Sequence, residues 1–345
     1  KGSPQAAEPR GRGLLSSAGA CFQWLEALLE AAASVPLGAR CGAPTPLPQR
    51  EECDFERDYE LTQKVLGTGK GGAVRLGVSK ASAEQVAVKC FELQEMDRRR
   101  YEDMLQEITV QCAVRHPHVA GVRAVYESES EVHLVLDHLA GGDLFEALKA
   151  DGPFSECAAV SAMEQLLDAL AHLHAEGIVH RDVKPENLVY ADAERSLVKL
   201  VDFGFVVRWD GAAPLRRYCG TERYMAPEMA RRSTYTEKVD VWSAGVVAHV
   251  LLTGDLPFAR PTDRSFRLSR RLGSLSAEAQ DFVRALLVAD PAERPGAAEA
   301  LRHPWIQSHG RPRVHHGPHP LLPKGCCGDL AKLGAALSDD SSTEA

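Results

Sequence analysis

The chain has 345 residues, a formal net charge of −8, and 26% charged residues. This negative balance argues against nonspecific binding to nucleic acid or to an anionic membrane surface. No stretch approaches the roughly 20 consecutive apolar residues that a transmembrane helix needs. Nine scattered cysteines without a C-x-x-C pair indicate reduced thiols, so we expect an intracellular and most simply a cytoplasmic protein. Residue 1 is lysine, which leaves targeting to an organelle open.

Composition divides the chain into three parts. Residues 1–56 are rich in Ala, Gly and Pro and predict a low-complexity extension. Within it, residues 21–33 include an apolar patch at helical spacing, which fits a short helix docked on the main domain or a surface for a partner. Residues 307–345 are rich in Gly, Pro and His and then end in an acidic, serine-rich stretch, which predicts a disordered tail.

The central part, residues 57–306, predicts an α+β fold with two lobes. Apolar and β-branched runs over 59–92 and 119–137 indicate a small, largely antiparallel sheet. The segment 97–114 between these runs has helical spacing. Later helices are expected over 155–176, 239–253, 276–288 and 296–302. We therefore expect a small sheet lobe with one main helix over 57–139 and a larger, mostly helical lobe over 140–306.

A glycine-rich segment lies between two of the expected strands. Leu66–Val74 contains the pattern G-x-G-x-x-G-x-V, in which glycines let backbone N–H groups approach phosphate oxygens closely. Taken alone, the pattern fits a Rossmann turn or a plain flexible hairpin equally well. A Rossmann turn requires a helix directly after the third glycine, whereas a strand-like run over 73–78 follows here.

A lysine at the end of the next strand has a candidate partner on the following helix. Lys89 ends the run Val86–Lys89. Glu107 follows on a predicted helix, and its spacing from His116-Pro117 is that expected for a carboxylate that orients the lysine. Together they would fix an ammonium group against the α- and β-phosphates of a nucleotide. Glu102 is the competing glutamate on the same helix.

The most specific catalytic pattern is His180–Leu188, which reads HRDVKPENL. Asp182 would accept the proton of a substrate hydroxyl, and Lys184 would neutralise charge on the transferred phosphoryl group. Asn187 supplies an amide oxygen, a hard ligand that suits Mg²⁺. Asp202, in Asp-Phe-Gly after a strand-like run, would hold a second metal position. The pattern predicts ATP and Mg²⁺, with Mn²⁺ as an alternative ion.

Two further expectations concern the support of this site. Glu228, in Ala-Pro-Glu, is expected to form a structural salt bridge with Arg294. Asp240 opens a helix and is expected to bind backbone N–H groups of the catalytic loop.

Together, these motifs resemble the eukaryotic protein kinase superfamily over about 59–306. Within this superfamily, the chain looks most similar to the calcium/calmodulin-dependent kinase group, including the calcium-dependent kinases of plants and protists. This similarity rests on three segments: Val-Lys-Leu-Val-Asp-Phe-Gly, Gly141–Phe145 and the C-terminal motif His303–Trp305. Lys184 is typical of serine/threonine kinases. The resemblance implies the two-lobed kinase fold and transfer of the γ-phosphate of ATP to a serine or threonine hydroxyl of a protein substrate.

Position by position, the resemblance also implies a nucleotide pocket. The glycine-rich hairpin would contribute Leu66, Gly67, Thr68, Gly69, Lys70, Gly71, Gly72 and Val74. The adenine would lie among Leu66, Val74, Ala87, Leu136, Val189 and Val201, with hinge hydrogen bonds to backbone groups of Asp137 and Leu139. Asp143 and Glu186 are assigned to the same site. They resemble acidic positions that bind basic residues of the substrate. This resemblance predicts Arg or Lys at position −3, three residues before the phosphorylated serine or threonine. Thr221 is expected to contact Asp182 and Lys184.

Three departures from the family pattern affect activation and the substrate. In the segment Phe205–Met225, Tyr218 and Thr221 are the hydroxyl side chains that precede Tyr224, and we expect activity without phosphorylation of this segment. Glu222-Arg223 replaces the usual Pro-Glu and inverts a local charge in the loop that meets the substrate. Gln111 occupies a helix position where the family has a hydrophobe. It either buries an unpaired amide, at a cost of about 1–3 kcal/mol, or points to solvent.

A fourth departure is a shortened region after Phe258. It carries arginines that form either a docking patch or a solvated surface: Arg260, Arg264, Arg267, Arg270 and Arg271. The chain contains no EF-hand loop pattern, and no basic amphipathic helix of the calmodulin-binding kind follows Trp305. We therefore expect no direct control by calcium from within this chain. We also expect a monomer.

Overall fold

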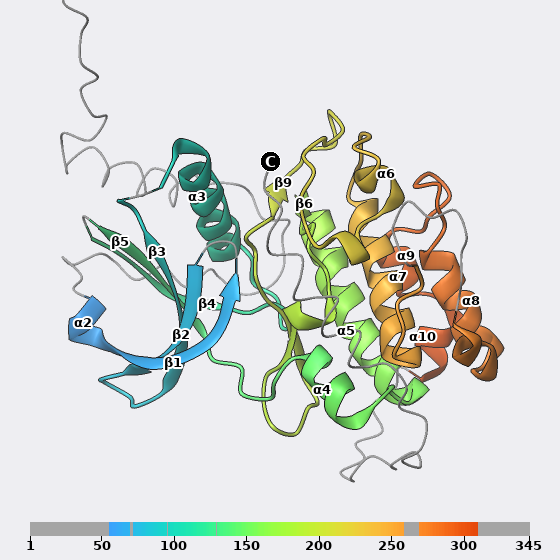
Figure 1. Cartoon of the computed structure of the whole chain (residues 1–345), viewed down its shortest axis with the longest axis horizontal. Helices are drawn as coiled ribbons and strands as arrows, with labels where there is room; N and C mark the ends of the chain where they lie inside the picture. The colour runs from blue at the N-terminus through green and yellow to red at the C-terminus, as the bar shows by residue number, and fades with distance from the viewer. Residues whose placement is uncertain (1–54, 70–71, 95, 129, 259–268, 310–345) are drawn as a thin grey trace, which may run out of the picture. The chain divides into compact units, whose positions relative to one another are not determined.

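A computed structural model describes residues 55–69, 72–94, 96–128, 130–258 and 269–309. Several sequence-based predictions lie outside these residues: the helix over 21–33, nearly all of the extension and the tail, Lys70, Gly71, and the arginines at 260, 264 and 267. The described residues form the α+β fold with two lobes that the sequence predicts (Figure 1). No helix among them is long and apolar enough to cross a membrane.

The small lobe is a five-stranded antiparallel sheet with the strand order β1-β2-β3-β5-β4. Its strands are β1 (Tyr59–Gly69), β2 (Gly72–Ser79), β3 (Gln85–Glu92), β4 (Val122–Glu127) and β5 (Glu131–Asp137). A short helix α2 (Phe55–Asp58) precedes them, and its Phe55 packs with Val86, Val88 and Val135 in a separate small core. Alternate residues of β3 therefore face this core, which leaves Ala87 and Lys89 on the other face of the sheet.

The main helix of the small lobe is α3 (Arg98–Ala113), which begins at the N-cap Asp97. The Asp97 side chain accepts a hydrogen bond from the Arg100 N–H, which satisfies one of the free donors of the first turn. The buried residues Met104, Ile108 and Gln111 recur at spacings of three and four, so they form one continuous face of the helix. This face includes Glu107, which connects α3 to the sheet lobe.

The large lobe is built around α7 (Lys238–Thr253), whose residues from Val239 onward are all buried. A helix that is apolar on all sides must be surrounded, and α7 contacts both α5 (Glu156–Ala175) and α8 (Ala277–Leu286) (Figure 1). The remaining helices are α4 (Leu144–Asp151), α6 (Pro227–Ala230), α9 (Ala297–Ala300) and α10 (Pro304–His309). The helix expected over 296–302 is thus a single turn followed by turn structure.

The end of α7 accounts for one residue of the predicted basic patch. Gly254 adopts the left-handed conformation, with φ of 77°, and ends the helix. Arg271, in the 3-10 helix η3 (Arg270–Ser274), donates to the Thr253 carbonyl at 2.9 Å. A cation at a helix C-terminus is favourable, so Arg271 has a structural contact, whereas Arg270 is exposed.

Two small sheets position the loops of the candidate site. Strand β6 (Ile178–Val179) pairs with β9 (Val207–Arg208), and β7 (Leu188–Tyr190) pairs with β8 (Val198–Leu200). The chain between β6 and β7 carries the HRDVKPEN motif, including the 3-10 turn η1 (Pro185–Asn187). The chain between β8 and β9 carries Asp202. Pairing of these strands therefore brings two sequence motifs to the same region.

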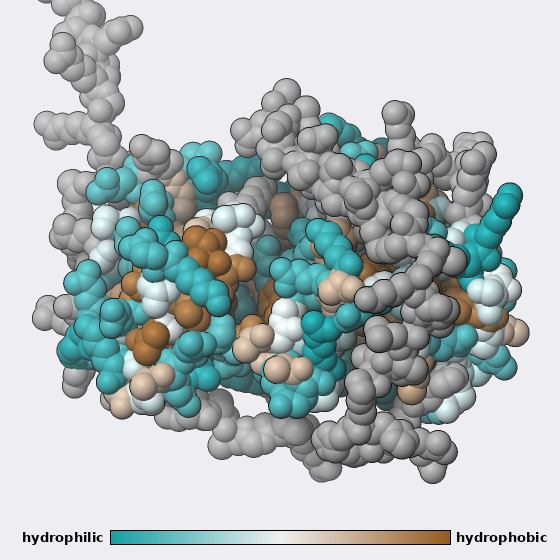
Figure 2. All heavy atoms as spheres, turned by 60° about the horizontal axis from the view of Figure 1, so that its bottom comes forward, coloured by the Kyte–Doolittle hydropathy of each residue, from teal (hydrophilic) through white to brown (hydrophobic). Residues whose placement is uncertain are grey.

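Most of the described surface visible in Figure 2 is hydrophilic, with hydrophobic patches toward the middle of the view. The large hydrophobic side chains that are exposed among the described residues are Val65, Leu66 and Tyr218. Two of these lie on β1 next to the glycine-rich turn.

Candidate active site

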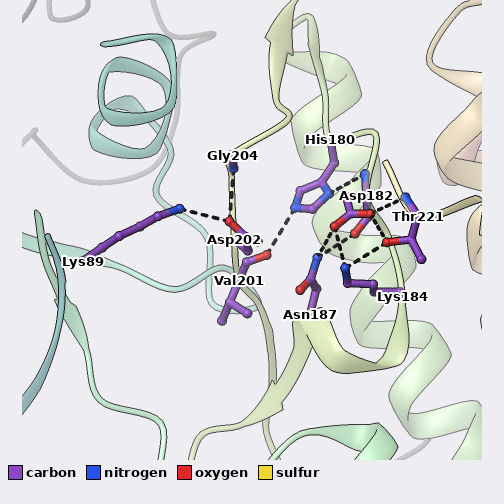
Figure 3. Close-up of polar contacts among 9 residues, drawn as sticks. All are labelled: Lys89, His180, Asp182, Lys184, Asn187, Val201, Asp202, Gly204 and Thr221. Atoms are coloured by element: carbon purple, nitrogen blue, oxygen red, sulfur yellow. Dashed lines mark hydrogen bonds and ion pairs between the residues drawn. The ribbon is translucent and has the colours of Figure 1, made fainter. Parts of the chain in front are cut away.

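Three charged side chains from separate elements meet at one side of the site. Lys89 on β3 donates to Glu107 on α3 at 2.5 Å. It also donates to Asp202, which follows β8, at 3.1 Å (Figure 3). The side chains of Lys89 and Glu107 are only 4% and 3% exposed. The competing Glu102 is exposed and pairs instead with Arg98. The expected pair between Lys89 and Glu107 is therefore present.

Electrostatic interactions within this cluster stabilise the charged forms of Lys89 and Asp202. Burial alone would lower the pKa of Lys89, but the carboxylates of Glu107 and Asp202 outweigh burial and raise that pKa. Burial would likewise raise the pKa of Asp202, but the Lys89 ammonium group outweighs it and lowers that pKa. Lys89 and Asp202 are therefore both charged near neutral pH.

Asp240 on α7 binds the backbone of the loop that follows β6. Its two carboxylate oxygens accept the backbone N–H groups of His180 at 2.8 Å and Arg181 at 2.7 Å, as the sequence predicts. His174, which the sequence analysis did not assign, contacts the same carboxylate at 3.0 Å. Burial would raise the pKa of Asp240, but its interactions with His174 and His180 outweigh burial and lower that pKa. The loop thus rests on an ionised, fully buried acceptor.

Asp182 lies at the centre of a second network (Figure 3). Its Oδ1 accepts from the Thr221 backbone N–H at 2.9 Å and from the Thr221 hydroxyl at 2.7 Å. Lys184 Nζ lies 2.9 Å from Asp182 Oδ2 and 2.9 Å from the Thr221 oxygen. The expected contacts of Thr221 with both residues are present, and together they fix the orientation of the Asp182 carboxylate.

Asn187 and Asp202 are the two residues predicted to bind metal. The Asn187 amide nitrogen donates to the Asp182 carbonyl at 2.8 Å and to Asp182 Oδ2 at 3.1 Å. The amide nitrogen therefore faces Asp182, and the amide oxygen faces the other way (Figure 3). Asp202 Oδ1 accepts from the Gly204 N–H at 3.3 Å as well as from Lys89.

The side-chain oxygens of Asn187 and Asp202 suit a hard cation whose remaining ligands are water and substrate phosphates. The described part of the chain contains no group of three or more His, Cys, Asp and Glu side chains that could hold a metal ion. Mg²⁺ is commonly bound by one or two protein carboxylates together with water and substrate phosphates. One carboxylate and one amide oxygen at the predicted nucleotide site match that requirement.

The backbone at two site residues is held in an unusual conformation. Arg181 and Asp202 have φ values of 68° and 56°, in the left-handed region that non-glycine residues seldom adopt. Such conformations cost about 1–3 kcal/mol each and occur mainly where the surroundings enforce them. No pattern in the sequence indicates this strain.

The glycine-rich hairpin lies close to Asp202. A Cβ atom added at Gly69 would lie 3.3 Å from Asp202 Oδ2, and one added at Gly72, with φ of 130°, would overlap the Cys90 carbonyl oxygen. The hairpin pairs Gly67 with Val74 and Thr68 with Ala73. Glycine is thus required at Gly72, and at Gly69 it avoids a tight contact with the Asp202 carboxylate.

The predicted adenine-site residues come from both lobes. Ala87 pairs with Leu136 in the sheet, and Val74 pairs with Lys89. Leu66 is exposed, whereas Leu139, Val189 and Val201 are partly buried. The Asp137 N–H donates to the Gly121 carbonyl at 3.0 Å.

The two acidic residues predicted to read the substrate differ in their surroundings. Asp143 caps α4 by accepting from the Glu146 N–H at 2.7 Å. Glu186 Oε2 is buried without a hydrogen-bond partner among the described residues. Burial raises the pKa of both carboxyl groups.

The expected structural salt bridge is present in the large lobe. Arg294 donates to Glu228 through two nitrogens, at 2.8 and 3.1 Å, and also to the Lys238 carbonyl at 2.8 Å. The Arg294 side chain is completely buried. A bidentate pair of this kind fixes both position and orientation.

Comparisons with known proteins agree with this geometry. The protein kinase domain family matches residues 59–306. The chain is 33% identical over 276 residues to the probable serine/threonine-protein kinase fhkC of Dictyostelium discoideum, covering 76% of this chain and 46% of that protein. It is 32% identical over 266 residues to myosin light chain kinase A of the same organism, covering 74% and 90%. It is 34% identical over 304 residues to calcium/calmodulin-dependent protein kinase type 1 of Caenorhabditis elegans, covering 81% and 85%.

Proposed function

Because the chain belongs to the protein kinase family, we propose a role for each residue of the site in the serine/threonine kinase reaction. The protein is a serine/threonine protein kinase related to the calcium/calmodulin-dependent kinases. It uses ATP and a divalent metal ion, and it phosphorylates a protein substrate. The assignments that follow apply this activity to the geometry of the site.

Lys89 holds the α- and β-phosphates of ATP, and Glu107 orients Lys89 by their buried ion pair. The charge that the carboxylates enforce on Lys89 supports this role, because a neutral amine would attract phosphate poorly. The backbone of the hairpin around Gly67, Gly69 and Gly72 covers the phosphates, since glycine permits that approach. The apolar residues around Ala87 and Leu136 hold the adenine ring.

Asp182 accepts a hydrogen bond from the substrate hydroxyl and orients its oxygen toward the phosphoryl group. Thr221 and Lys184 keep the Asp182 carboxylate in one orientation, which reduces the reorganisation needed at the moment of transfer. Lys184 also offsets negative charge that develops on the transferred group.

Asn187 and Asp202 would hold Mg²⁺, with Mn²⁺ as an alternative ion. The bound ion would supply positive charge that offsets the charge of the ATP phosphates. The lowered pKa of Asp202 supports this role because only the ionised carboxylate is a good ligand.

The substrate is a serine- or threonine-containing segment with Arg or Lys at the −3 position. The buried and unpartnered oxygen of Glu186 supports this preference, since it would gain a partner in a basic substrate side chain. We further propose that the kinase domain spans 57–306, that the protein acts as a monomer in the cytoplasm, and that it is active without phosphorylation of Phe205–Met225.

The observation that carries the proposal is the joint arrangement of Lys89, Asp202 and Asp182 on strands and loops far apart in the sequence. The test is incubation of the full chain with labelled ATP, Mg²⁺ and a peptide with arginine at −3. Asp182→Asn should abolish transfer. The matched control Asp281→Asn, an exposed carboxylate on α8, should leave it unchanged. Binding of Mg-ATP without any transfer would instead indicate a scaffold protein.

A further inference from the structure

An ion pair that the sequence analysis did not anticipate joins the segment Phe205–Met225 to α3. Arg217 Nη1 lies 2.5 Å from Asp103 Oδ1, and Arg217 Nη2 lies 2.6 Å from Asp103 Oδ2. Both side chains are about three-quarters buried. Two parallel hydrogen bonds between a guanidinium and a carboxylate fix direction as well as distance. The contact spans 114 positions in the sequence.

Asp103 is well placed to influence the Lys89–Glu107 pair. It lies four residues before Glu107 on α3, so both side chains project from the same face of the helix. Burial raises the pKa of Glu107, and the negative charge of Asp103 adds to that rise. The guanidinium of Arg217 lies against the Asp103 carboxylate and offsets its negative charge.

The other side of Arg217 is anchored on the catalytic loop. The Arg217 carbonyl accepts from the Tyr235 hydroxyl at 2.6 Å, and that hydroxyl accepts from Arg181 at 3.2 Å. Leu215 and Tyr235 exchange two backbone hydrogen bonds of 2.9 Å. Arg181 directly precedes Asp182. A continuous chain of contacts therefore runs from Asp182 through Arg217 to α3.

We propose that Arg217 and Asp103 form a permanent positioning device that holds α3, and with it Glu107, in the arrangement needed to orient Lys89. This inference rests on the proposed function. Kinases commonly achieve such ordering when a phosphate group on the equivalent segment meets basic residues. Here the charges are reversed, because the segment supplies the cation and α3 supplies the anion.

The reversed polarity has a direct consequence. A phosphate group at position 217 would lie beside Asp103 and near Glu107 and would be repelled by both. The guanidinium, in contrast, stays charged at all physiological pH values. Positioning of α3 is thus independent of phosphorylation of the segment.

The test uses the full chain after phosphatase treatment, with mass spectrometry to verify the absence of phosphate. Arg217→Gln and Asp103→Asn should each lower kcat/KM for ATP about tenfold. The charge-swapped double variant Asp103→Arg with Arg217→Asp should recover to within about threefold of the wild type, because the pair is restored with opposite polarity. The neighbouring Arg216→Gln, which removes an exposed arginine, is the control and should leave kcat/KM unchanged.

Two further measurements separate this proposal from the proposed function. Amide hydrogen exchange of α3 and the dissociation constant of Mg-ATP are both independent of phosphoryl transfer. Each single variant should exchange faster in α3 and bind Mg-ATP more weakly, and the swap should reverse both changes. If the wild type transfers no phosphate while these changes occur, the proposed function fails and the positioning role stands.

The opposite pattern overturns the positioning role. If the wild type is active and the single variants match it in kcat/KM and in α3 exchange, the ion pair positions nothing. A loss that the charge swap does not recover also counts against the proposal. Arg217→Lys keeps the positive charge but cannot form two parallel hydrogen bonds. It serves as a milder variant in case the other substitutions prevent folding. Its kcat/KM should lie between those of the wild type and Arg217→Gln.

Discussion

Gln111 lies on the buried face of α3, one turn after Glu107, and is 2% exposed. The sequence left open whether it faces solvent or the interior, and the structure places it in the interior. Its Nε2 has no hydrogen-bond partner among the described residues. The side chain thus carries a desolvated donor inside the helix face that holds Glu107.

Replacement of Gln111 by methionine removes this donor without changing the shape of the side chain. An unpaired buried amide costs about 1–3 kcal/mol. Methionine is unbranched and of similar length, so it should open no cavity and cause no overpacking. We therefore expect Gln111→Met to increase the free energy of unfolding by about 1–2 kcal/mol. For a domain of this size each kcal/mol raises the melting temperature by about 2–4 °C.

The assay is urea and thermal unfolding of the wild type and variant, followed by circular dichroism, together with kcat for a peptide substrate. Gln165→Met is the matched control. Its amide groups bind the Val198 N–H at 2.8 Å and the Ser196 carbonyl at 3.1 Å, so the same substitution should destabilise by about 1–2 kcal/mol. If Gln111→Met destabilises the protein as much as Gln165→Met does, the Gln111 amide is satisfied and the reasoning is wrong.

Four other substitutions test the supports of the site and the glycine-rich hairpin. Arg294→Met should lower the free energy of unfolding by about 3–5 kcal/mol, measured by urea denaturation, because Glu228 would remain buried without its partner; an unchanged midpoint would contradict this. Asp240→Ala should destabilise the protein by about 2–4 kcal/mol and reduce kcat, since two backbone N–H groups lose a charged acceptor; normal kcat would show that the loop does not need it. Gly69→Ala should raise KM for ATP several-fold in steady-state assays without changing the melting temperature, because its added Cβ would lie 3.3 Å from the Asp202 carboxylate. Gly67→Ala, whose Cβ would meet nothing within 4 Å, should have the smaller effect, and the reverse order would argue against close approach of the hairpin.

The fold was largely predictable because its signals are local. Strand periodicity, helical spacing and the turn residues between them each depend on short windows of sequence, and the expected helix over 97–114 is observed as α3 (Arg98–Ala113). The pairing of Lys89 with Glu107 was predictable for a different reason. Both residues lie within motifs whose order along the chain matches a known family, so the resemblance supplied the long-range contact.

Contacts outside such motifs could not be predicted. Arg217 and Asp103 are ordinary charged residues in their local sequence, and only the folded chain brings them together. The orientation of Gln111 was ambiguous because helical spacing identifies a face but does not say how far burial extends around it. The positive φ values of Arg181 and Asp202 arise from tertiary packing, which no local propensity encodes.

Arg217 and Gln111 act on the same helix in opposite directions, which makes their coupling measurable. The Arg217–Asp103 pair attaches the first half of α3 to the segment before Thr221, whereas the unpaired amide of Gln111 weakens the packing of its second half. If both act through the position of Glu107, their effects are not additive. We expect Arg217→Gln to reduce kcat/KM about tenfold in the wild type but only about threefold when Gln111 is methionine, because better packing of α3 compensates for the lost ion pair. An equal loss in both backgrounds would mean that the two contacts do not control a shared helix position.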